Sequence, residues 1–395
     1  MLFNLLNVLG AVLPAAAFVH PGLLHTAADF ERITSNVDSA TEPWSTAWNK
    51  LISSPYADSG YSPQAVPVVY RGSDGTNAEN YQYLYEDIAA AYALAVCWKV
   101  TGDSTYGDAA IKVLDAWSST LTALGGDSDQ YLASGIYGYE FAQAGEIMRD
   151  YSSWGNFDAF VTMMVDVFYA KVNDWFVNHD AGEYAQYAPG VYANWDLCNM
   201  ASAMAIGILS DNETMYDQGY QWFFDGPTNG QINRVVPFLH TVDGQILGQT
   251  QESGRDQGHG MLEIALLGPI GLMAYNQGDD SIMSNNDSII LSAAEYMAKY
   301  NLGYDVPYTA YSNGQLDLPT ISATDRGDQR PIWELLYNHY GALKGLNVTW
   351  TEQYRDAVNA ANGGAEGGSG DYGSTSGGYD QLGWGTLMYT LNADA

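Results

Sequence analysis

The chain has 395 residues, of which 47% are hydrophobic and 15% charged, a composition that excludes a disordered or collagen-like protein. Its 46 acidic residues outnumber 14 Lys and Arg and give a formal net charge of −32. A chain this acidic offers no basic surface for nucleic acid, so we expect no nucleic-acid partner.

The chain begins with a short apolar run, MLFNLLNVLGAVLPAAA, which closes at Ala15, Ala16 and Ala17. Such a run is typical of a cleaved secretory signal peptide and is too short to span a membrane. We therefore expect a signal peptide over 1–17, a mature domain over 18–395, secretion and no membrane partner. Three glycosylation sequons fit this route, and their acceptors are Asn212, Asn286 and Asn347.

Most of the remaining sequence has a helical pattern. Apolar residues recur at helical spacing over 84–98 and 106–121, with a Thr-Gly-Asp turn between the two stretches. Further helices are predicted over 134–151, 157–177, 195–209, 215–224, 255–267, 270–274, 289–300, 332–343 and 352–361. Successive helical hairpins that each bury one face favour an all-α, single-domain (α/α) toroid of about six to seven hairpins.

Two features lie outside this simple pattern. The stretch 363–378, GGAEGGSGDYGSTSGG, has the low complexity of a flexible loop, and apolar sequence resumes at 382–391, which places the loop inside the domain. Cys97 and Cys198 each lie in an apolar helical pattern. A disulfide between them and burial of both as free thiols are equal alternatives.

Two helix starts carry polar side chains that are typical of caps. In the segment 248–267, GQTQESGRDQGHGMLEIALL, Ser253 followed by Asp256 has the form of a capping box and predicts that a helix begins at Ser253. Asn194 lies directly before the predicted helix 195–209, in the position of an N-cap.

The same segment concentrates groups that handle an anion. Arg255, His259 and Glu263 are spaced at four residues, which places them on one helix face, and Gln251 and Glu252 come just before. An arginine, a titratable histidine and a helix N-terminus at one point indicate an anion-binding site. The alternative is a surface capping network in which Glu252 pairs with Arg255.

Metal and nucleotide chemistry find little support in the sequence. It contains no H-E-x-x-H motif, no Cys/His cluster and no Gly-rich phosphate loop. His179 and His240 each end a helical stretch, where a structural role is the simpler interpretation. We expect no cofactor, and a structural calcium ion at Asp127 and Asp129 stays open.

Five runs in combination are distinctive: YLYEDIAAAYALAVCWKVTGDSTYGDAAIKVLDAWSSTL, SGIYGYEFAQAGEIMRD, NWDLCNMASAMAIGILSDN, QESGRDQGH and NQGDD. Together they resemble the alginate-lyase-domain superfamily of (α/α)-toroid polysaccharide lyases, and most closely polysaccharide lyase family 38. The resemblance covers about residues 81–311. It implies an (α/α) toroid and β-elimination of a β-1,4-linked uronan, such as glucuronan or alginate, to 4,5-unsaturated uronides.

The chemistry of β-elimination suggests a role for each polar residue. The C5 proton of a uronate becomes acidic only when its C6 carboxylate is neutralised, and a base and an acid are also needed. Asn194, Gln251 and Arg255 are suitable donors to the carboxylate. Glu252 either orients Arg255 or binds the carboxylate itself, and His259 is the candidate base. A tyrosine is the candidate acid, or both acid and base if an adjacent arginine lowers its pKa.

The chain departs from the related lyases at two points. They commonly carry Asn-His where this chain has Asn194-Trp195, and a tyrosine beyond the arginine where this chain has Met261 and Leu262. The catalytic tyrosine is therefore expected elsewhere, among Tyr187, Tyr192, Tyr304, Tyr308 and Tyr311, with preference for Tyr308 and Tyr311. The remaining predicted substrate contacts are Trp195, Tyr187, Tyr192, Tyr304, His339 and Arg71.

The net charge opposes the capture of a polyanion and keeps other functions open. A locally positive cleft with Arg255 and Arg71, joined by Arg326 or Arg330, would offset the repulsion.

One alternative is a glycoside hydrolase of the same fold that uses Asp196 with Glu252 or Glu263, and the other is a non-catalytic glycan-binding protein. We expect an acidic polysaccharide as the partner and a monomeric enzyme.

Overall fold

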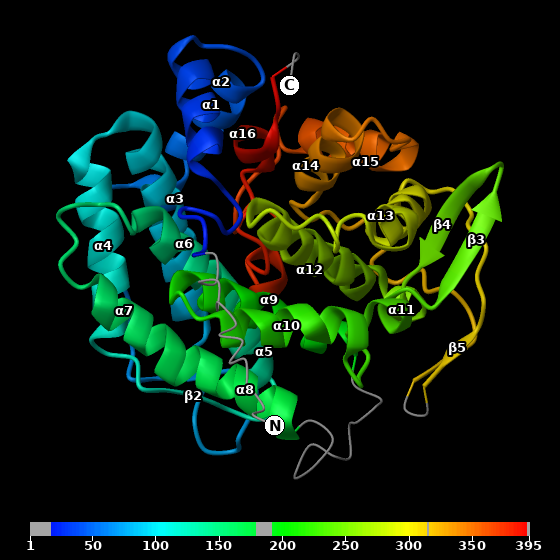
Figure 1. Ribbon diagram of the computed structural model, residues 1–395, viewed down its shortest axis with the longest axis horizontal. Coiled ribbons are helices and arrows are strands. Elements are labelled where there is room, and N and C mark those ends of the chain that lie inside the picture. Colours follow the sequence, from blue (N-terminus) through cyan, green and yellow to red (C-terminus); the bar gives the residue numbers. More distant parts are fainter. Residues whose placement is uncertain (1–16, 179–191, 314–315, 393–395) are drawn as a thin grey trace, which may run out of the picture.

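The computed structural model describes residues 17–178, 192–313 and 316–392, and helices dominate it (Figure 1). Four inner helices lie through its centre, each packed on the next in the order α3, α6, α9 and α12. Their bounds are Gln82–Thr101, Gly138–Met148, Ala193–Leu209 and Gln257–Asn276. All of α6, nearly all of α9 and most of α12 are buried, because these helices are apolar around their whole circumference.

Outer helices cover this inner layer. α4 (Ser104–Ser118) packs on α3, α10 (Glu213–Asp225) on α9 and α13 (Asn285–Asn301) on α12. α7 (Phe157–Met163) continues through a π-helical segment, Met164–Tyr169, into α8 (Ala170–Asn178), and that segment packs on α6 and α9. Short turns with good caps separate the layers, as at α4, where the side chain of Asp103 accepts from the N–H of Thr105.

The first and last helices close the ring (Figure 1). α1 (Ala27–Asp38) packs on α3, and α16 (Gly385–Tyr389) packs on α1, α2 (Trp44–Ile52) and α14 (Trp333–Leu336). α14 runs into a π-helical segment, Tyr337–Leu343, and packs on α15 (Thr349–Ala361), which also packs on α13. The predicted (α/α) toroid is therefore confirmed.

The strands of the described residues are short and paired. β1 (Val68–Tyr70) lies parallel to β2 (Ala123–Gly125), and β5 (Tyr311–Ser312) pairs antiparallel with β6 (Asp317–Leu318). The hairpin of β3 (Phe238–Val242) and β4 (Gln245–Gln249) leads into a 3₁₀ turn, η4 (Gln251–Gly254), directly before α12. Two short helices, α5 (Gln130–Leu132) and α11 (Ile232–Val235), complete the order.

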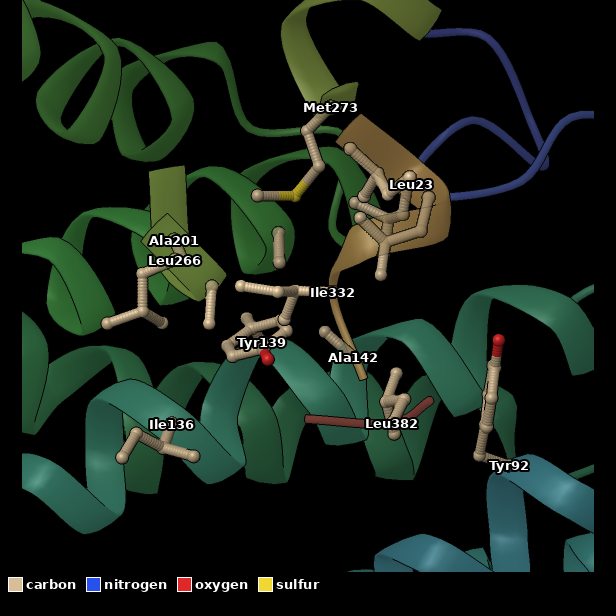
Figure 2. Close-up of a cluster of buried hydrophobic side chains, with 14 of the residues drawn as sticks. Leu23, Tyr92, Ile136, Tyr139, Ala142, Ala201, Leu266, Met273, Ile332 and Leu382 are labelled. Atoms are coloured by element: carbon tan, nitrogen blue, oxygen red, sulfur yellow. The ribbon is translucent and has the colours of Figure 1, made fainter. Parts of the chain in front are cut away.

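Apolar side chains from many helices meet at the centre of the ring (Figure 2). Each buried side chain of the size of Leu contributes about 1.5–3 kcal/mol relative to exposure, so this centre is the main source of stability. The labelled residues in this cluster are Leu23, Tyr92, Ile136, Tyr139, Ala142, Ala201, Leu266, Met273, Ile332 and Leu382.

The N-terminal ends of the inner helices gather on one face of the toroid. A π-helical segment, Ala133–Tyr137, leads into α6 and packs on α9, where Ser134 Oγ donates to Asn199. The first residues of α9 bond to η4, which precedes α12. Arg71, which precedes α3, bonds to Tyr137. This N-terminal face is defined by the starts of α3, α6, α9 and α12. α6 continues the helical segment before it, so the face presents the positive ends of the α3, α9 and α12 dipoles.

Most predicted helices are confirmed, with one error of continuity. The segments 255–267 and 270–274 were expected to be two helices, but α12 runs unbroken from Gln257 to Asn276 through Pro269. A proline removes one backbone bond from a helix. Here the burial of both flanking turns holds the helix together.

The prediction of a flexible loop over 363–378 is wrong in its first part. Residues 365–369 are buried, and the carboxylate of Glu366 accepts from the N–H groups of Trp333 and Glu334. Gly368 lies so close to Trp384 that an added Cβ would fall 2.1 Å from the indole. The glycines there permit close packing rather than mobility.

The two cysteines are both free and buried, Cys97 in α3 and Cys198 in α9, so no disulfide forms between them. Burial raises the pKa of Cys97 to about 12. A thiol held in this way is unreactive and packs as a small apolar side chain.

Candidate functional site

A buried carboxylate joins the starts of α9 and α12. Glu252, in η4, accepts through Oε1 from the backbone N–H of Asn194 at 3.1 Å and from its Nδ2 at 2.7 Å. Its Oε2 accepts from Nη1 of Arg255 at 2.7 Å. Asn194 is therefore not the predicted N-cap of α9, which is Tyr192, but a side-chain partner of Glu252. Both oxygens of Glu252 are used, so it orients Arg255 and does not face a substrate carboxylate.

Asp256 links the arginine to the histidine. Its Oδ2 lies 3.6 Å from Nε of Arg255 and 2.7 Å from Nδ1 of His259. Its Oδ1 accepts from the backbone N–H of His259 and thereby caps α12. The expected start at Ser253 is wrong, because Asp256 is the N-cap and Arg255 lies before the helix. A direct chain of contacts therefore runs from Asn194 to His259.

The carboxylate of Asp256 orients the imidazole ring of His259. Burial acts to raise the pKa of Asp256, but hydrogen bonds from the His259 ring and backbone and the charge of Arg255 hold it below its usual value. The ionised Asp256 only accepts, so this hydrogen bond places a proton on Nδ1 of His259 and leaves Nε2 on the side of the ring away from the carboxylate. The His259 side chain is 39% exposed and that of Arg255 25%, so both reach the surface.

Gln251 brings one tyrosine to the same place. Its Oε1 accepts from the N–H of Ala193 at 2.9 Å, and its Nε2 donates to the hydroxyl of Tyr311 at 2.9 Å. Since the hydroxyl oxygen is an acceptor in this bond, its own proton is not used by Gln251. Burial raises the pKa of Tyr311 above its usual value, which keeps the hydroxyl protonated.

Two aromatic residues at the start of α9 flank the site. The guanidinium of Arg255 lies over the ring of Tyr192, 3.6 Å from its centroid. Trp195 is partly exposed and packs on Trp175, with ring centroids 5.7 Å apart. An arginine held on an aromatic face is fixed in direction while its outer N–H groups stay available.

Tyr308 and Tyr304 have partners of their own outside this chain of contacts. The hydroxyl of Tyr308 lies against Gly254 but donates to the carbonyl of Leu318 at 2.9 Å, and burial raises its pKa to about 12. That proton is committed to the backbone. Tyr304 is half exposed, packs on Trp350 at 4.8 Å and lies three residues beyond Asn301, whose amide donates to Gln257 at the start of α12, so its contact with the substrate stays a prediction.

His339 lies at the far end of the toroid. Its ring packs on Tyr275, 4.9 Å between centroids, in the last turn of α12. At 1.5 Å per residue, Tyr275 is about 27 Å from the start of that helix. The predicted substrate contact of His339 is therefore wrong.

Arg71 lies on the N-terminal face, beside the start of α3. Its Nη1 donates to the hydroxyl of Tyr137 at 3.2 Å, and its guanidinium lies over the ring of Tyr81 at 5.2 Å. A surface hollow next to it is lined in part by Tyr81 and Tyr85. The loop of Arg71 is held by Asp127, whose carboxylate accepts from the N–H groups of Ser73 and Asp129.

The other two arginines expected at a positive cleft are occupied. Arg326 donates to the carbonyls of Tyr300 and Tyr304, and Arg330 pairs with Asp380 at 3.0 Å. Arg255 and Arg71 are therefore the cations that the N-terminal face offers from the predicted set.

The carboxylates of the hydrolase alternative are enclosed. Glu252, Glu263 and Asp196 are all 0% exposed. Asp196 accepts from the indole N–H of Trp175 and from the N–H of Gly230. Hydrolysis needs two carboxyl groups facing the sugar. This arrangement does not provide them.

Of the remaining predicted residues, some lie outside the described ranges and His240 lies in a strand. Tyr187 and His179 fall between the described ranges. His240 lies in β3, not at a helix end, and its ring contacts Gln249 at 3.1 Å. Within the described ranges, no group of three His, Cys, Asp or Glu side chains is arranged to hold a metal, and no helix is long and apolar enough to cross a membrane.

The sequence interpretation missed one member of the site, Asp256. A signal was present, because an aspartate three residues before a histidine at a helix start both caps the helix and reaches the imidazole.

The comparisons with known proteins agree with this fold. The family model described as alginate lyase matches residues 36–303, which is more than half of the chain. No curated protein sequence matches significantly.

Three solved structures share the fold at low identity. Alginate lyase A1-III from Sphingomonas species A1 has a TM-score of 0.56 and 13% identity, covering 95% of this chain and 98% of that chain. An alginate lyase from Bacteroides ovatus has a TM-score of 0.58 and 12% identity, covering 95% and 100%. A variant of A1-III complexed with a tetrasaccharide has a TM-score of 0.54 and 14% identity, covering 95% and 97%. By its family match and its (α/α) toroid, the chain belongs to the alginate lyase family and is a polysaccharide lyase.

Proposed function

We propose that the protein is a secreted lyase that cleaves a β-1,4-linked uronan, glucuronan or alginate of the polymannuronate type, by β-elimination to 4,5-unsaturated uronides. The observation that carries this proposal is the bridge by Asp256 between a partly exposed arginine and a partly exposed histidine. The first binds a carboxylate and the second accepts a proton, the two tasks that elimination at C5 requires.

The order of events follows from the positions of these groups. Arg255 binds the C6 carboxylate and stabilises the charge that develops on it as the C5–H bond breaks. Nε2 of His259 takes the C5 proton, and Asp256 stabilises the imidazolium that forms. The electron pair forms the C4–C5 double bond, and the C4–O4 bond breaks. Tyr311 donates its hydroxyl proton to O4 of the leaving sugar.

The buried residues act through others. Asn194 and Glu252 hold Arg255 in position, and Gln251 holds the hydroxyl of Tyr311. We call these positioning residues, because they are enclosed and face other side chains. The ring of Tyr192 packs against the guanidinium of Arg255. Trp195 and Arg71 remain proposed contacts to neighbouring sugars.

Incubation with a panel of uronans tests the proposal. Purified protein is mixed with glucuronan, polymannuronate, polyguluronate and a neutral β-glucan, and ultraviolet absorbance is followed together with reducing ends. The proposal requires both signals to rise on glucuronan or polymannuronate. Reducing ends without the absorbance of a conjugated double bond would mean hydrolysis, and binding without either product would mean a glycan-binding protein.

Export and glycosylation belong to the same proposal. The segment after residue 17 is anchored in the fold, since the N–H of Val19 donates to Gln277 and His20 contacts Glu146. Asn286 and Asn347 are exposed, and Asn212 is partly exposed. Mass spectrometry of the secreted protein, before and after enzymatic removal of N-glycans, would show an N-terminus at Phe18 and a mass loss if the proposal holds.

A further inference from the structure

One buried acid beneath the site has no part in the proposed mechanism. Glu263 lies two turns into α12, is 0% exposed, and accepts through Oε2 from the backbone N–H of Glu252 at 3.2 Å. Its other oxygen, Oε1, has no hydrogen-bond partner within the described part of the chain. A carboxyl group enclosed in this way is costly to ionise, because burial disfavours the charged form.

The groups that face Glu263 do not supply a second positive charge. η4 contributes Glu252, and the residues on either side of η4 contribute the hydroxyl of Thr250 and the guanidinium of Arg255. β5 contributes Tyr311. Arg255 is already paired with Glu252. Burial first, and the charge of Glu252 second, raise the pKa of Glu263 well above its usual value. Its surroundings therefore favour the uncharged form of Glu263.

We propose that Glu263 is a positioning residue whose carboxyl group holds the backbone of Glu252 and thereby aims Arg255 at the carboxylate of the substrate. This inference rests on the proposed function. The charge balance of the site gives the reason: two carboxylates, those of Glu252 and Asp256, already lie against the one guanidinium of Arg255, so a further negative charge would oppose binding of a uronate carboxylate. An ionised Glu263 would add a negative charge directly beneath that carboxylate.

The consequence is a specific pH dependence of binding. As the pH rises into the range where Glu263 ionises, the KM for the uronan should rise more than kcat falls, because the added charge opposes binding of the carboxylate. Loss of the hydrogen bond to Glu252 would act differently, since it would displace Arg255 at every pH.

Two substitutions separate these effects. Glu263→Gln keeps an oxygen that can accept from the N–H of Glu252 and is neutral at every pH. Glu263→Leu has no acceptor and leaves that buried N–H without its partner, which should lower kcat/KM by about tenfold. We expect the Gln variant to restore most of this loss and to lack the alkaline rise in KM. A Gln variant that keeps the rise, or that loses as much activity as the Leu variant, would overturn the proposal.

The chain offers a matched control in Glu366. It is also buried, accepts from two backbone N–H groups and has an Oε1 without a partner, but it lies at the start of α14. Glu366→Gln should leave the dependence of KM on pH as in the parent enzyme. A change equal to that of Glu263→Gln would mean that the effect is general and would overturn the specific role.

A measurement without turnover keeps the two proposals distinguishable. Infrared difference spectra of the intact protein show the C=O stretch of a protonated carboxylic acid, and the band of Glu263 should disappear in Glu263→Gln at neutral pH. If this band is present but no uronan is cleaved, the proposed function fails while the neutral state of Glu263 stands. If the band is absent, the inference about Glu263 fails whatever the activity.

Discussion

Two pairs of buried glutamates in this toroid are built alike. At the start of α12, Glu263 accepts a backbone N–H and Glu252 accepts side-chain donors. At the start of α14, Glu366 accepts two backbone N–H groups, and Glu334 accepts from three side chains, those of Asn338, Asn359 and Thr386. Burial raises the pKa of Glu263 and of Glu366 well above the usual range.

Each pair even has an arginine lying over a tyrosine ring nearby. Arg255 lies over Tyr192 at 3.6 Å, and Arg355 lies over Tyr337 at 3.5 Å. Arg355, however, pairs with Asp356, which is exposed and leads to no titratable base. Only the first pair continues through an aspartate to a histidine at the surface. Buried carboxylates at a helix start therefore do not mark an active site by themselves, whereas their connection to an exposed base does.

Removal of the base should have the largest effect. His259→Ala is expected to lower kcat by roughly 10²–10⁴-fold, the usual contribution of a positioned base. Asp256→Asn should have a smaller effect in the same direction, because its amide no longer fixes the tautomer of the imidazole. Initial rates of ultraviolet absorbance on the best uronan measure both. Turnover of His259→Ala near that of the parent enzyme would assign the proton to another group.

The two arginines provide the next test of the comparison. Arg255→Ala should lower kcat/KM by roughly 10²–10³-fold, as expected for loss of a preorganised donor to the developing charge. Arg355→Ala is the matched control, because it removes an arginine stacked on tyrosine beside the other pair. Equal activities of the two variants, in preparations with the same thermal unfolding temperature, would contradict the distinction between the pairs.

The helices were predictable because their information is local. The stripe over 84–98 and the apolar run over 195–209 correspond to α3 and α9 within a few residues. The start of α12 could not be predicted from the sequence, because Ser253 and Asp256 are both good N-cap residues. Their tertiary contacts decide between them: Ser253 Oγ donates to the carbonyl of Thr250, which leaves Asp256 to cap the helix.

Most members of the site were predictable, Asp256 being the exception, but their roles were not. Asn194, Gln251, Glu252, Arg255 and His259 do come together, as the resemblance implied. Their division into exposed and buried groups depends on how η4 docks against α9, which involves residues 58 positions apart in the chain. For the same reason His339 was misplaced: a polar, aromatic local sequence is the same at either end of a toroid, and only the path of α12 shows which end it occupies.

Two buried histidines, His25 and His339, make the stability of the protein depend on pH. Burial lowers the pKa of His25 and of His339 to about 4, whereas an unfolded chain has its usual value near 6.5. As the pH falls, these histidines are therefore protonated in the unfolded state at a higher pH than in the folded state. Stability is complete above about pH 6.5 and is lost as the pH falls toward 4, by up to about 3 kcal/mol for each histidine. Urea unfolding at several pH values measures this loss, and His25→Gln should reduce it; an unchanged profile would contradict the burial of a neutral imidazole.

The smallest expected effect is that of salt on activity, and it compares the charge of the whole surface with the charge of the N-terminal face. A protein of charge −32 repels a polyuronate at long range, whereas the N-terminal face presents helix dipoles, Arg255 and Arg71 at short range. Salt screens the first interaction more than the second, because the Debye length is about 10 Å at 0.1 M. Raising ionic strength from a few millimolar should therefore increase kcat/KM on long uronans by a few-fold, and Arg71→Gln should lower affinity for long chains more than for short oligomers. Activity that falls steadily with salt would instead mean that local attraction dominates capture, and the acidic surface would then have little influence on the reaction.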